Sequence, residues 1–478
     1  MQHGQPIFRG PIGLAARLGA VSFAALLASC AAVGPDYREP AAAAPQQWNG
    51  AAAARFDADS AGDLSAWWQR LNDPTLSALI GRALAANVDL QSAQARLREA
   101  RARRLLAGAQ HLPTVSASGS ASTTRAGSEA LTARDGNYFS AGLDASWEPD
   151  VFGGLRRGIE AAQADLQSSI ASLQSTQVSL VAEVGLSYVD LRAAQRRLAI
   201  ARDNLERQRE TLQLTRWRAQ AGLVGELDVE QSRATVEQTA AAVPALETAI
   251  ASAGHRLAIL LAQAPGSLQD ELAAQGEIPL PPQRIVVGIP ADALRQRPDV
   301  RAAERRVAAE TARIGQAEAN RYPGFTLTGS VGLDALTIGG LSSSAALTRS
   351  LAAGVAGVLF DGGRRRQAVE IQDAIAEQAV ASYRSTVLSA LEDVENALVA
   401  LQNSERRQAA LGNAATAARS AAGLARHRYT SGLIDFQAVI DTERSVLTIE
   451  DSLASAQADG ATAVIRLYKA LGGGWSGT

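Results

Sequence analysis

The chain has 478 residues, of which 47% are hydrophobic, 20% charged and only 4% aromatic, with 41 Gly and 16 Pro. This composition favours long, closely packed helices over a compact enzyme with an aromatic core. A single Cys excludes a disulfide framework and a multi-cysteine metal centre, and a net charge of −2 argues against a nucleic-acid partner. The four His residues are scattered, so we expect no metal and no cofactor. Protein or lipid partners are expected instead.

The first thirty residues have the pattern of a bacterial export signal. Arg9 and Arg17 precede an apolar run over 18–28, which has the length of a signal-peptide core and is too short to span a bilayer. The run ends in Leu-Ala-Ser-Cys, which resembles a lipoprotein processing site, and Cys30 is the only Cys. An inert buried thiol behind an ordinary signal is the alternative. We predict that residues 1–29 are removed and that lipidation of Cys30 anchors the chain without spanning the membrane.

The remaining chain repeats one plan at an offset of about 210 residues. Residues 87–114 align with 297–324, residues 152–157 with 360–365, and residues 218–223 with 428–433. Three matches near one offset indicate an internal duplication of a helix, two strands, a long helix, a tight turn and a returning helix. The predicted organisation is a lipidated, extended lead-in over 30–63, a first repeat over 64–290 and a second repeat with a C-terminal tail over 291–478.

Each repeat has room for one very long helix. No Pro occurs between Pro149 and Pro244, or after Pro323, and a helix over 155–221 would measure ~100 Å. Apolar residues recur along it at heptad spacing, namely Ile170, Val184, Leu191, Leu198, Leu205 and Leu212, and in the second copy Val380, Val387, Val394 and Leu401. A simple rod-like coiled coil would show the same pattern. The Pro-rich interval 265–298 is expected to be the crossover between the repeats.

Two segments, 140–147 and 325–333, instead alternate polar and apolar residues, as strands do. A more weakly patterned run over 114–122 precedes the first and the run 351–360 follows the second, which predicts four strands in two hairpins, with aromatic residues near their ends. This arrangement is typical of outer-membrane barrels, although a soluble sheet capping the helices is the alternative. Because an open sheet edge is costly in lipid, four strands require further copies of the chain. Two copies would give eight strands and a filled interior, and three would give twelve strands and a lumen.

These residues resemble the TolC-like outer-membrane efflux factors, in their NodT-type lipoprotein branch, over the mature length. The matching stretches are Cys30 to Tyr37 with Pro40, Trp67-Trp68 with Asp73 to Leu76, Gly288 to Pro290 with Leu294 to Arg301, Leu359 to Gly363, and Arg428-Tyr429 with Gly432 and Asp441. The resemblance implies a mixed α and membrane-β fold: a homotrimer with a twelve-stranded barrel in the outer membrane and a periplasmic α-barrel.

The resemblance also implies a function and partners. The trimer would be the exit duct of a tripartite pump that exports small molecules, joined to a periplasmic adaptor protein and an inner-membrane resistance-nodulation-division transporter. The expected location is the outer membrane, in contact with its lipid and projecting into the periplasm.

The gate is expected at the far end of the long helices. The turns at Gly222 and Gly432, with Tyr429, would form the periplasmic tip. The resemblance places an acidic ring just after the second turn, where Asp441 occupies the matching position. Asp228 is a weaker candidate on the first turn, where a solvated helix acid is the favoured explanation. For Asp441 the alternative is a surface pair with Arg444.

Other classes of protein explain fewer of these features. A lipid-anchored hydrolase would need a catalytic motif, and the chain contains neither G-x-S-x-G nor H-E-x-x-H, so no enzymatic activity is expected. A periplasmic helical scaffold or adaptor would share the heptads but lack the hairpins with aromatic ends. An outer-membrane duct for protein secretion stays open as an alternative to small-molecule export.

Overall fold

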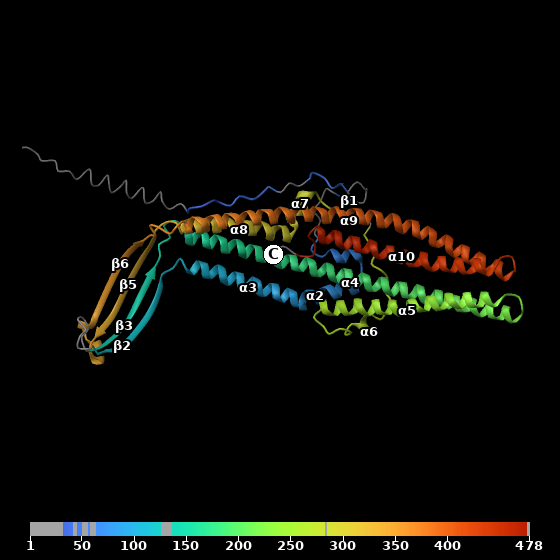
Figure 1. The fold of residues 1–478 in the computed structure, drawn as a ribbon, viewed down its shortest axis with the longest axis horizontal. Helices are drawn as coiled ribbons and strands as arrows, with labels where there is room; N and C mark the ends of the chain where they lie inside the picture. The colour runs from blue at the N-terminus through green and yellow to red at the C-terminus, as the bar shows by residue number, and fades with distance from the viewer. Residues whose placement is uncertain are drawn as a thin grey trace, which may run out of the picture. The chain divides into compact units, whose positions relative to one another are not determined.

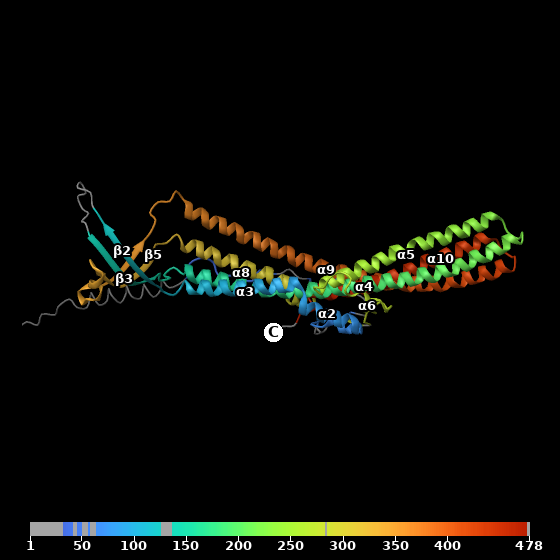
Figure 2. The same ribbon diagram turned by 90° about the horizontal axis from the view of Figure 1, so that it is seen from below.

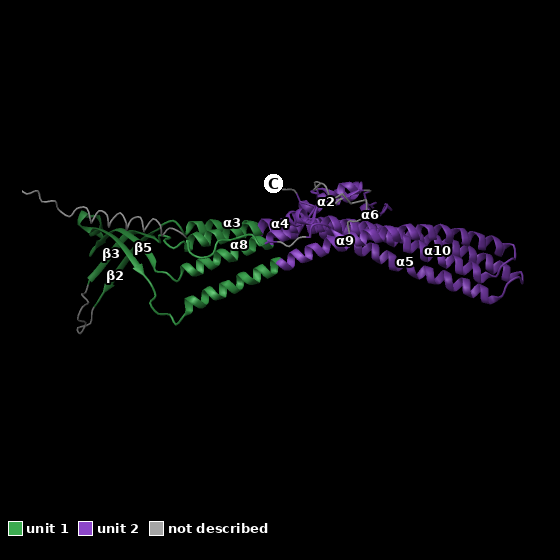
Figure 3. Cartoon of the chain, turned by 90° about the horizontal axis from the view of Figure 1, so that it is seen from above, with its two compact units in different colours: residues 1–40, 97–168, 303–383 green, residues 41–96, 169–302, 384–478 purple. Residues whose placement is uncertain are grey.

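The computed structural model describes residues 32–41, 45–49, 56–57, 64–125, 136–282 and 284–475. The predicted signal peptide and Cys30 lie outside these described residues. The chain divides into two compact units, and each takes segments from both sequence repeats (Figure 3). Unit 1 consists of 1–40, 97–168 and 303–383, and unit 2 consists of 41–96, 169–302 and 384–478.

Unit 1 contains an antiparallel sheet of four strands in the order β2-β3-β5-β6 (Figure 1). Its strands are β2 (Thr114–Thr124), β3 (Gly136–Trp147), β5 (Gly324–Ala335) and β6 (Leu347–Ala356). Three of them contain the predicted segments, but the predicted bounds of the last strand are wrong. Pairing between β5 and β6 ends where Ala356 lies opposite Gly324. The residue before Gly324 is Pro323, which has no N–H with which to continue the ladder.

The two faces of this sheet differ sharply in polarity. One face carries the exposed apolar side chains of Val115, Leu143, Trp147, Val331, Leu347, Leu351 and Val355. The other face carries mainly Ser, Thr and Gly. The alternation of side chains along each strand produces this division, and it places the predicted apolar set 141, 143, 145 and 147 together.

The aromatic residues near the strand ends lie in different surroundings. Phe152 stacks on Tyr322 with ring centroids 4.5 Å apart, and Phe325, near the start of β5, lies 6.3 Å from Phe152. Tyr138 instead lies on the polar face, where its hydroxyl donates to Asp334 at 2.8 Å. The aromatic residues therefore do not all lie on the apolar face.

The helices occur in pairs of equal length, each offset by 210 residues. The pairs are α3 (Val88–Ala109) with α8 (Pro298–Ala319), α4 (Gly154–Gln220) with α9 (Arg364–Thr430), and α5 (Glu226–Leu260) with α10 (Phe436–Ala470). α4 and α9 each have 67 residues, as the long-helix prediction requires. α5 runs through Pro244 without ending there. None of the described helices is both long and apolar enough to cross a bilayer.

Most of the predicted heptad seam of α4 is buried, with Ile170 the exception. Val184, Leu191, Leu198, Leu205 and Leu212 are each at most 8% exposed. In the second copy Val387, Val394 and Leu401 are also buried. Ile170 and its counterpart Val380 are only half-buried, so the heptad pattern identifies the packed face over the rest of the seam but not at this position.

Unit 2 has a large core in which short elements pack on the long helices. The short elements are η2 (Trp67–Leu71), α2 (Pro74–Ala86), α6 (Gln269–Leu272) and α7 (Pro290–Gln296). Trp67 is fully buried and stacks on Tyr468, with ring centroids 5.2 Å apart. The segment between α5 and α7 runs across α4, where the Arg192 guanidinium donates to the carbonyl of Ala274 at 2.7 Å.

The described residues of the lead-in form long-range contacts, each within the unit to which it belongs. In unit 1, Val33 donates its N–H to the carbonyl of Phe152, and Arg157 donates to Asp36. In unit 2, the indole of Trp48 is buried and donates to the carbonyl of Gly288 at 3.1 Å. Strand β1 (Phe56–Asp57) pairs in parallel with β4 (Ile285–Val286). Composition alone did not predict these contacts.

Candidate functional site: the tips of the two helical hairpins

Two helical hairpins of unit 2 end in turns with the same backbone geometry. α5 returns beside α4, and α10 returns beside α9 (Figures 1 and 2). Gly222 and Gly432 each have φ of 73°, a left-handed conformation that favours glycine. In each turn the N–H of the following Leu reaches back to an Arg carbonyl at 2.9 Å, which closes a Schellman motif.

Each hairpin holds its own two helices together with an apolar seam. In the first hairpin Leu205 and Leu212 of α4 pack with Val229 and Val236 of α5. In the second, a different set packs near the turn, namely Ala425, Tyr429, Phe436, Val439 and Ile440. The rings of Tyr429 and Phe436 lie 5.2 Å apart. Each hairpin is therefore a packed pair by itself.

Between the hairpins the contact is polar. Four residues of α4, spaced by seven positions, donate hydrogen bonds to the second hairpin: Arg197 to Asp451, Asn204 to Glu450, Thr211 to Glu443, and Arg218 to the carbonyl of Tyr429. We call these four residues of α4 the polar ladder. Seven-residue spacing places its members on one face of α4, beside the apolar seam.

The two glutamates that accept from the polar ladder each have a second partner, and Glu450 is the more deeply buried of the two. Glu450 is 7% exposed, and it accepts from Arg419 of α9 at 2.6 Å as well as from Asn204. Glu443 accepts from Arg426 of α9 at 3.2 Å and from Thr211 at 2.9 Å. Removing one partner of such a pair leaves a poorly solvated charge, which is strongly destabilising.

Arg218 and Tyr429 form the contact nearest the turns. The guanidinium carbon of Arg218 lies 4.3 Å from the centre of the Tyr429 ring, a cation–π geometry. Tyr429 is 4% exposed, and burial raises the pKa of its hydroxyl above the ordinary value. The neighbouring positive charge of Arg218 opposes that rise.

The two candidate gate acids lie in different surroundings. Asp441 is exposed on α10 and accepts a hydrogen bond from Gln437 at 2.9 Å, while Arg444 donates to Thr235 of α5. Asp228 is half-buried in the first turn of α5, where a negative charge is favoured by the helix dipole. The structure thus leaves the Asp441 carboxylate more accessible than that of Asp228.

Sequence reasoning missed the polar ladder, although its signals were present. Asn204 and Thr211 are seven positions apart, as are Glu443 and Glu450, and as are Arg419 and Arg426. Each spacing marks a stripe on one helix. The sequence does not specify which stripe on α4 faces which stripe on α9 or α10.

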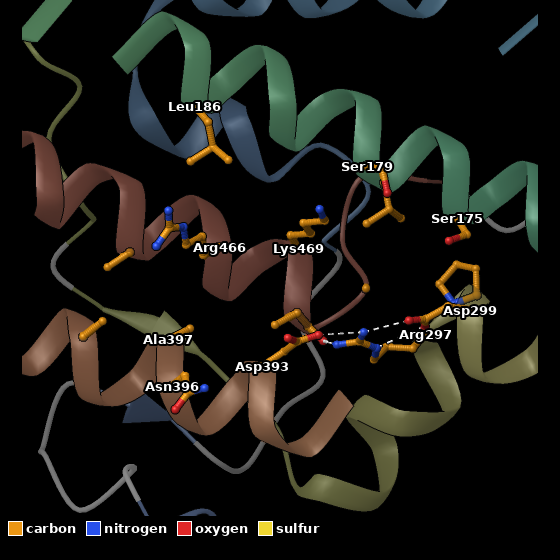
Figure 4. Close-up of a pocket in the computed structure, with 16 residues that line it drawn as sticks. Ser175, Ser179, Leu186, Arg297, Asp299, Asp393, Asn396, Ala397, Arg466 and Lys469 are labelled. Atoms are coloured by element: carbon orange, nitrogen blue, oxygen red, sulfur yellow. Dashed lines mark hydrogen bonds and ion pairs between the residues drawn. The ribbon is translucent and has the colours of Figure 1, made fainter. Parts of the chain in front are cut away.

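A second polar cluster joins three helices where α8 begins (Figure 4). Arg297 is 7% exposed and donates to Asp299, to Asp393 and to the carbonyl of Ala470. Burial by itself would lower the pKa of Arg297, but the carboxylates of Asp299 and Asp393 more than offset burial and raise it. The cluster lines a cavity of about 480 Å³. Because all three guanidinium nitrogens have partners, we interpret the cluster as a structural junction.

The fold combines a sheet that is apolar on one exposed face with long helical hairpins, which is the architecture of a TolC-like trimeric outer-membrane channel. The model of the family described as "Outer membrane efflux protein" matches residues 79–263 and 289–473. The chain belongs to this outer membrane efflux protein family. The two matched segments are offset by 210 residues, as the internal duplication predicts.

Individual relatives agree with this assignment over almost the whole chain. Nodulation protein T of Rhizobium leguminosarum bv. trifolii is 33% identical over 461 residues, which cover 95% of this chain and 96% of the relative. The pyoverdine export outer membrane protein OpmQ of Pseudomonas putida is 34% identical over 417 residues, covering 86% and 88%. The solved structure of the outer-membrane channel OprN is 38% identical with a TM-score of 0.88, covering 93% and 99%.

These similarities confirm the predicted family and its NodT-type branch, the fold class and the role of an efflux channel subunit. The relatives named for pyoverdine export and as an outer-membrane channel give no support to the enzyme alternative.

Proposed function

We propose that the chain forms a homotrimeric duct through which small molecules leave the cell across the periplasm and the outer membrane. The observation that carries the proposal is the four-stranded sheet, whose apolar face is exposed and whose outer strands, β2 and β6, have no further partner among the described residues. In lipid such edges must be paired. Three copies would supply twelve strands and a water-filled interior.

The proposed partners follow from the family. A periplasmic adaptor would contact the hairpin tips around Gly222 and Gly432, and an inner-membrane resistance-nodulation-division transporter would supply the cargo. A relative named for pyoverdine export supports small molecules as that cargo. Planar-bilayer recording tests the duct: the purified protein should give discrete ion currents, and a protein that inserts without conducting would overturn the proposal.

The proposed gate is a ring of three Asp441 carboxylates near the threefold axis. Like charges held close together attract multivalent cations, so cations added from the periplasmic side should block the current of the wild-type duct. Asp441→Ala should weaken that block about tenfold or more. Asp228→Ala is the matched control and should leave it nearly unchanged. Equal block of wild type and Asp441→Ala by multivalent cations would contradict the assignment of the gate to Asp441.

The proposed membrane anchor is a lipid on Cys30, added after removal of residues 1–29. Support comes from the apolar run, the Leu-Ala-Ser approach and the absence of any other Cys. Mass spectrometry of the mature N-terminus should find a diacylglycerol-modified Cys30, and Cys30→Ala should mature poorly yet still trimerise. An unmodified mature N-terminus at another position would contradict the proposal.

A further inference from the structure

One charged residue interrupts the apolar face of the sheet. Arg349 of β6 lies opposite Val331 in the ladder and between Leu347 and Leu351 on the same face. Every other described strand residue on this face is uncharged. A guanidinium in this setting needs an anionic partner or water, because an apolar surface does not solvate it.

The sheet itself offers no such partner. The two acidic residues of the four strands, Asp144 and Asp334, lie on the opposite face, where they accept hydrogen bonds from Ser118 and from Tyr138 and Thr348. Among the described residues Arg349 makes no ion pair.

A neighbouring copy would not supply a partner from its strands either. In a closed barrel the free edge of β6 would pair with the free edge of β2 from the next copy. β2 contains only Thr, Val, Ser, Ala and Gly. Within the strands of the proposed barrel Arg349 therefore has no counter-ion.

The position of Arg349 indicates which region of the membrane it would face. It is the third residue of β6 from the end joined to the β5–β6 loop, and Ala356 at the other end leads toward α9. With ~3.3 Å per residue and a strand tilt of ~40°, Arg349 would lie ~5 Å below the loop end of its strand. The helices extend into the periplasm under the proposed function, so this end faces the outer leaflet. A long Arg side chain can extend along the apolar surface to the headgroups.

We propose that Arg349 binds a phosphate group of lipid A in the outer leaflet, one lipid per chain. The proposal rests on the proposed barrel in the outer membrane. The guanidinium fork matches the geometry of phosphate oxygens and can form two charge-assisted hydrogen bonds at once. Leu347, Leu351 and Val331 would contact the acyl chains beside that headgroup.

The test counts lipids on the intact channel by native mass spectrometry. Wild type, Arg349→Gln and Arg349→Lys would be compared, with Arg233→Gln on the exposed face of α5 as the control. Arg349→Gln removes a charge from an apolar surface and so should not impair folding. Wild type and the control should retain up to three molecules of bisphosphorylated lipid A per trimer. Arg349→Gln should bind it about tenfold more weakly or worse, and Arg349→Lys should be intermediate.

Two further arms identify the source of the phosphate. Dephosphorylated lipid A should bind wild type as weakly as lipid A binds Arg349→Gln. Equal retention by wild type and Arg349→Gln would overturn the proposal, and so would phosphatidylglycerol binding as tightly as lipid A. Current recording on the same samples distinguishes failure of this proposal from failure of the proposed function. A wild-type protein that conducts no current would contradict the proposed channel, whatever the lipid counts show.

Discussion

Helices α4 and α9 occupy equivalent places in the two repeats, but their large apolar side chains differ in exposure. Within the described residues, α9 leaves Ile371, Ile375, Leu388, Val399 and Leu424 substantially exposed, whereas Trp217 is the large apolar side chain exposed on α4. The seam of α4 is covered by other parts of the same chain. Of the two duplicated helices, α4 therefore buries most of its large apolar side chains within the chain, whereas α9 leaves several of them exposed.

This difference indicates how the repeats have specialised. Exposed apolar patches on soluble surfaces mark contacts with other molecules. The open surface of α9 is therefore where we expect a second copy of the chain to pack. At the buried equatorial positions the repeats still agree, with Leu191 matched by Leu401. Toward the tips they diverge, with Leu205 and Leu212 matched by Ala415 and Ala422.

The largest expected effect comes from a charge on the open surface of α9. Leu388 is 66% exposed in the single chain, so Leu388→Glu should leave the fold of the chain intact. In a trimer it would bury an unpaired carboxylate at each of the interfaces. We expect dissociation to monomers in size-exclusion chromatography with light scattering. Leu388→Met, which conserves volume and polarity, should stay trimeric; a trimer of the Glu variant would show that α9 does not form the interface.

A smaller effect on stability is expected at Leu205 of the first hairpin, whose counterpart in the second hairpin is Ala415. Leu205 is 8% exposed and packs in the seam with α5, so Leu205→Ala should destabilise the first hairpin by ~2–5 kcal/mol. Hydrogen exchange of the α4 and α5 amides measures that cost. Leu205→Met should cost less than ~1.5 kcal/mol. Unchanged protection in Leu205→Ala would mean that this apolar seam does not hold α4 and α5 together.

These predictions also define what the sequence could and could not specify. Helix lengths, strands and turns follow from local periodicity, and the duplication repeats each signal. The pairing of Thr211 with Glu443 joins residues more than 200 positions apart and depends on the rotation of each helix. The buried indole of Trp48 likewise donates to the carbonyl of Gly288, a residue 240 positions away. The composition of the lead-in does not predict this hydrogen bond. Asp441 could be named only through family resemblance.

The smallest effect concerns Tyr429, which has Ala219 as its counterpart in the first repeat. Because burial raises the pKa of Tyr429 in the folded state, its stabilising contribution is fully present below the unfolded value of about 10. It is lost as the pH rises through the folded pKa. Wild type should therefore lose more thermal stability than Tyr429→Phe between pH 8 and pH 11, measured by circular dichroism. Identical losses would indicate that Tyr429 ionises as readily in the folded chain as in the unfolded chain.

The most direct test of the central claim, that three chains form one duct, is the protein mass of the detergent-solubilised particle. Light scattering corrected for bound detergent should give about three times the mass of one mature chain. Arg349 and Asp441 lie outside the expected α9 interface, so variants at these positions should give the same mass. A monomeric particle from protein that is folded by circular dichroism would contradict the account, because four strands with two unpaired edges cannot form a channel in lipid.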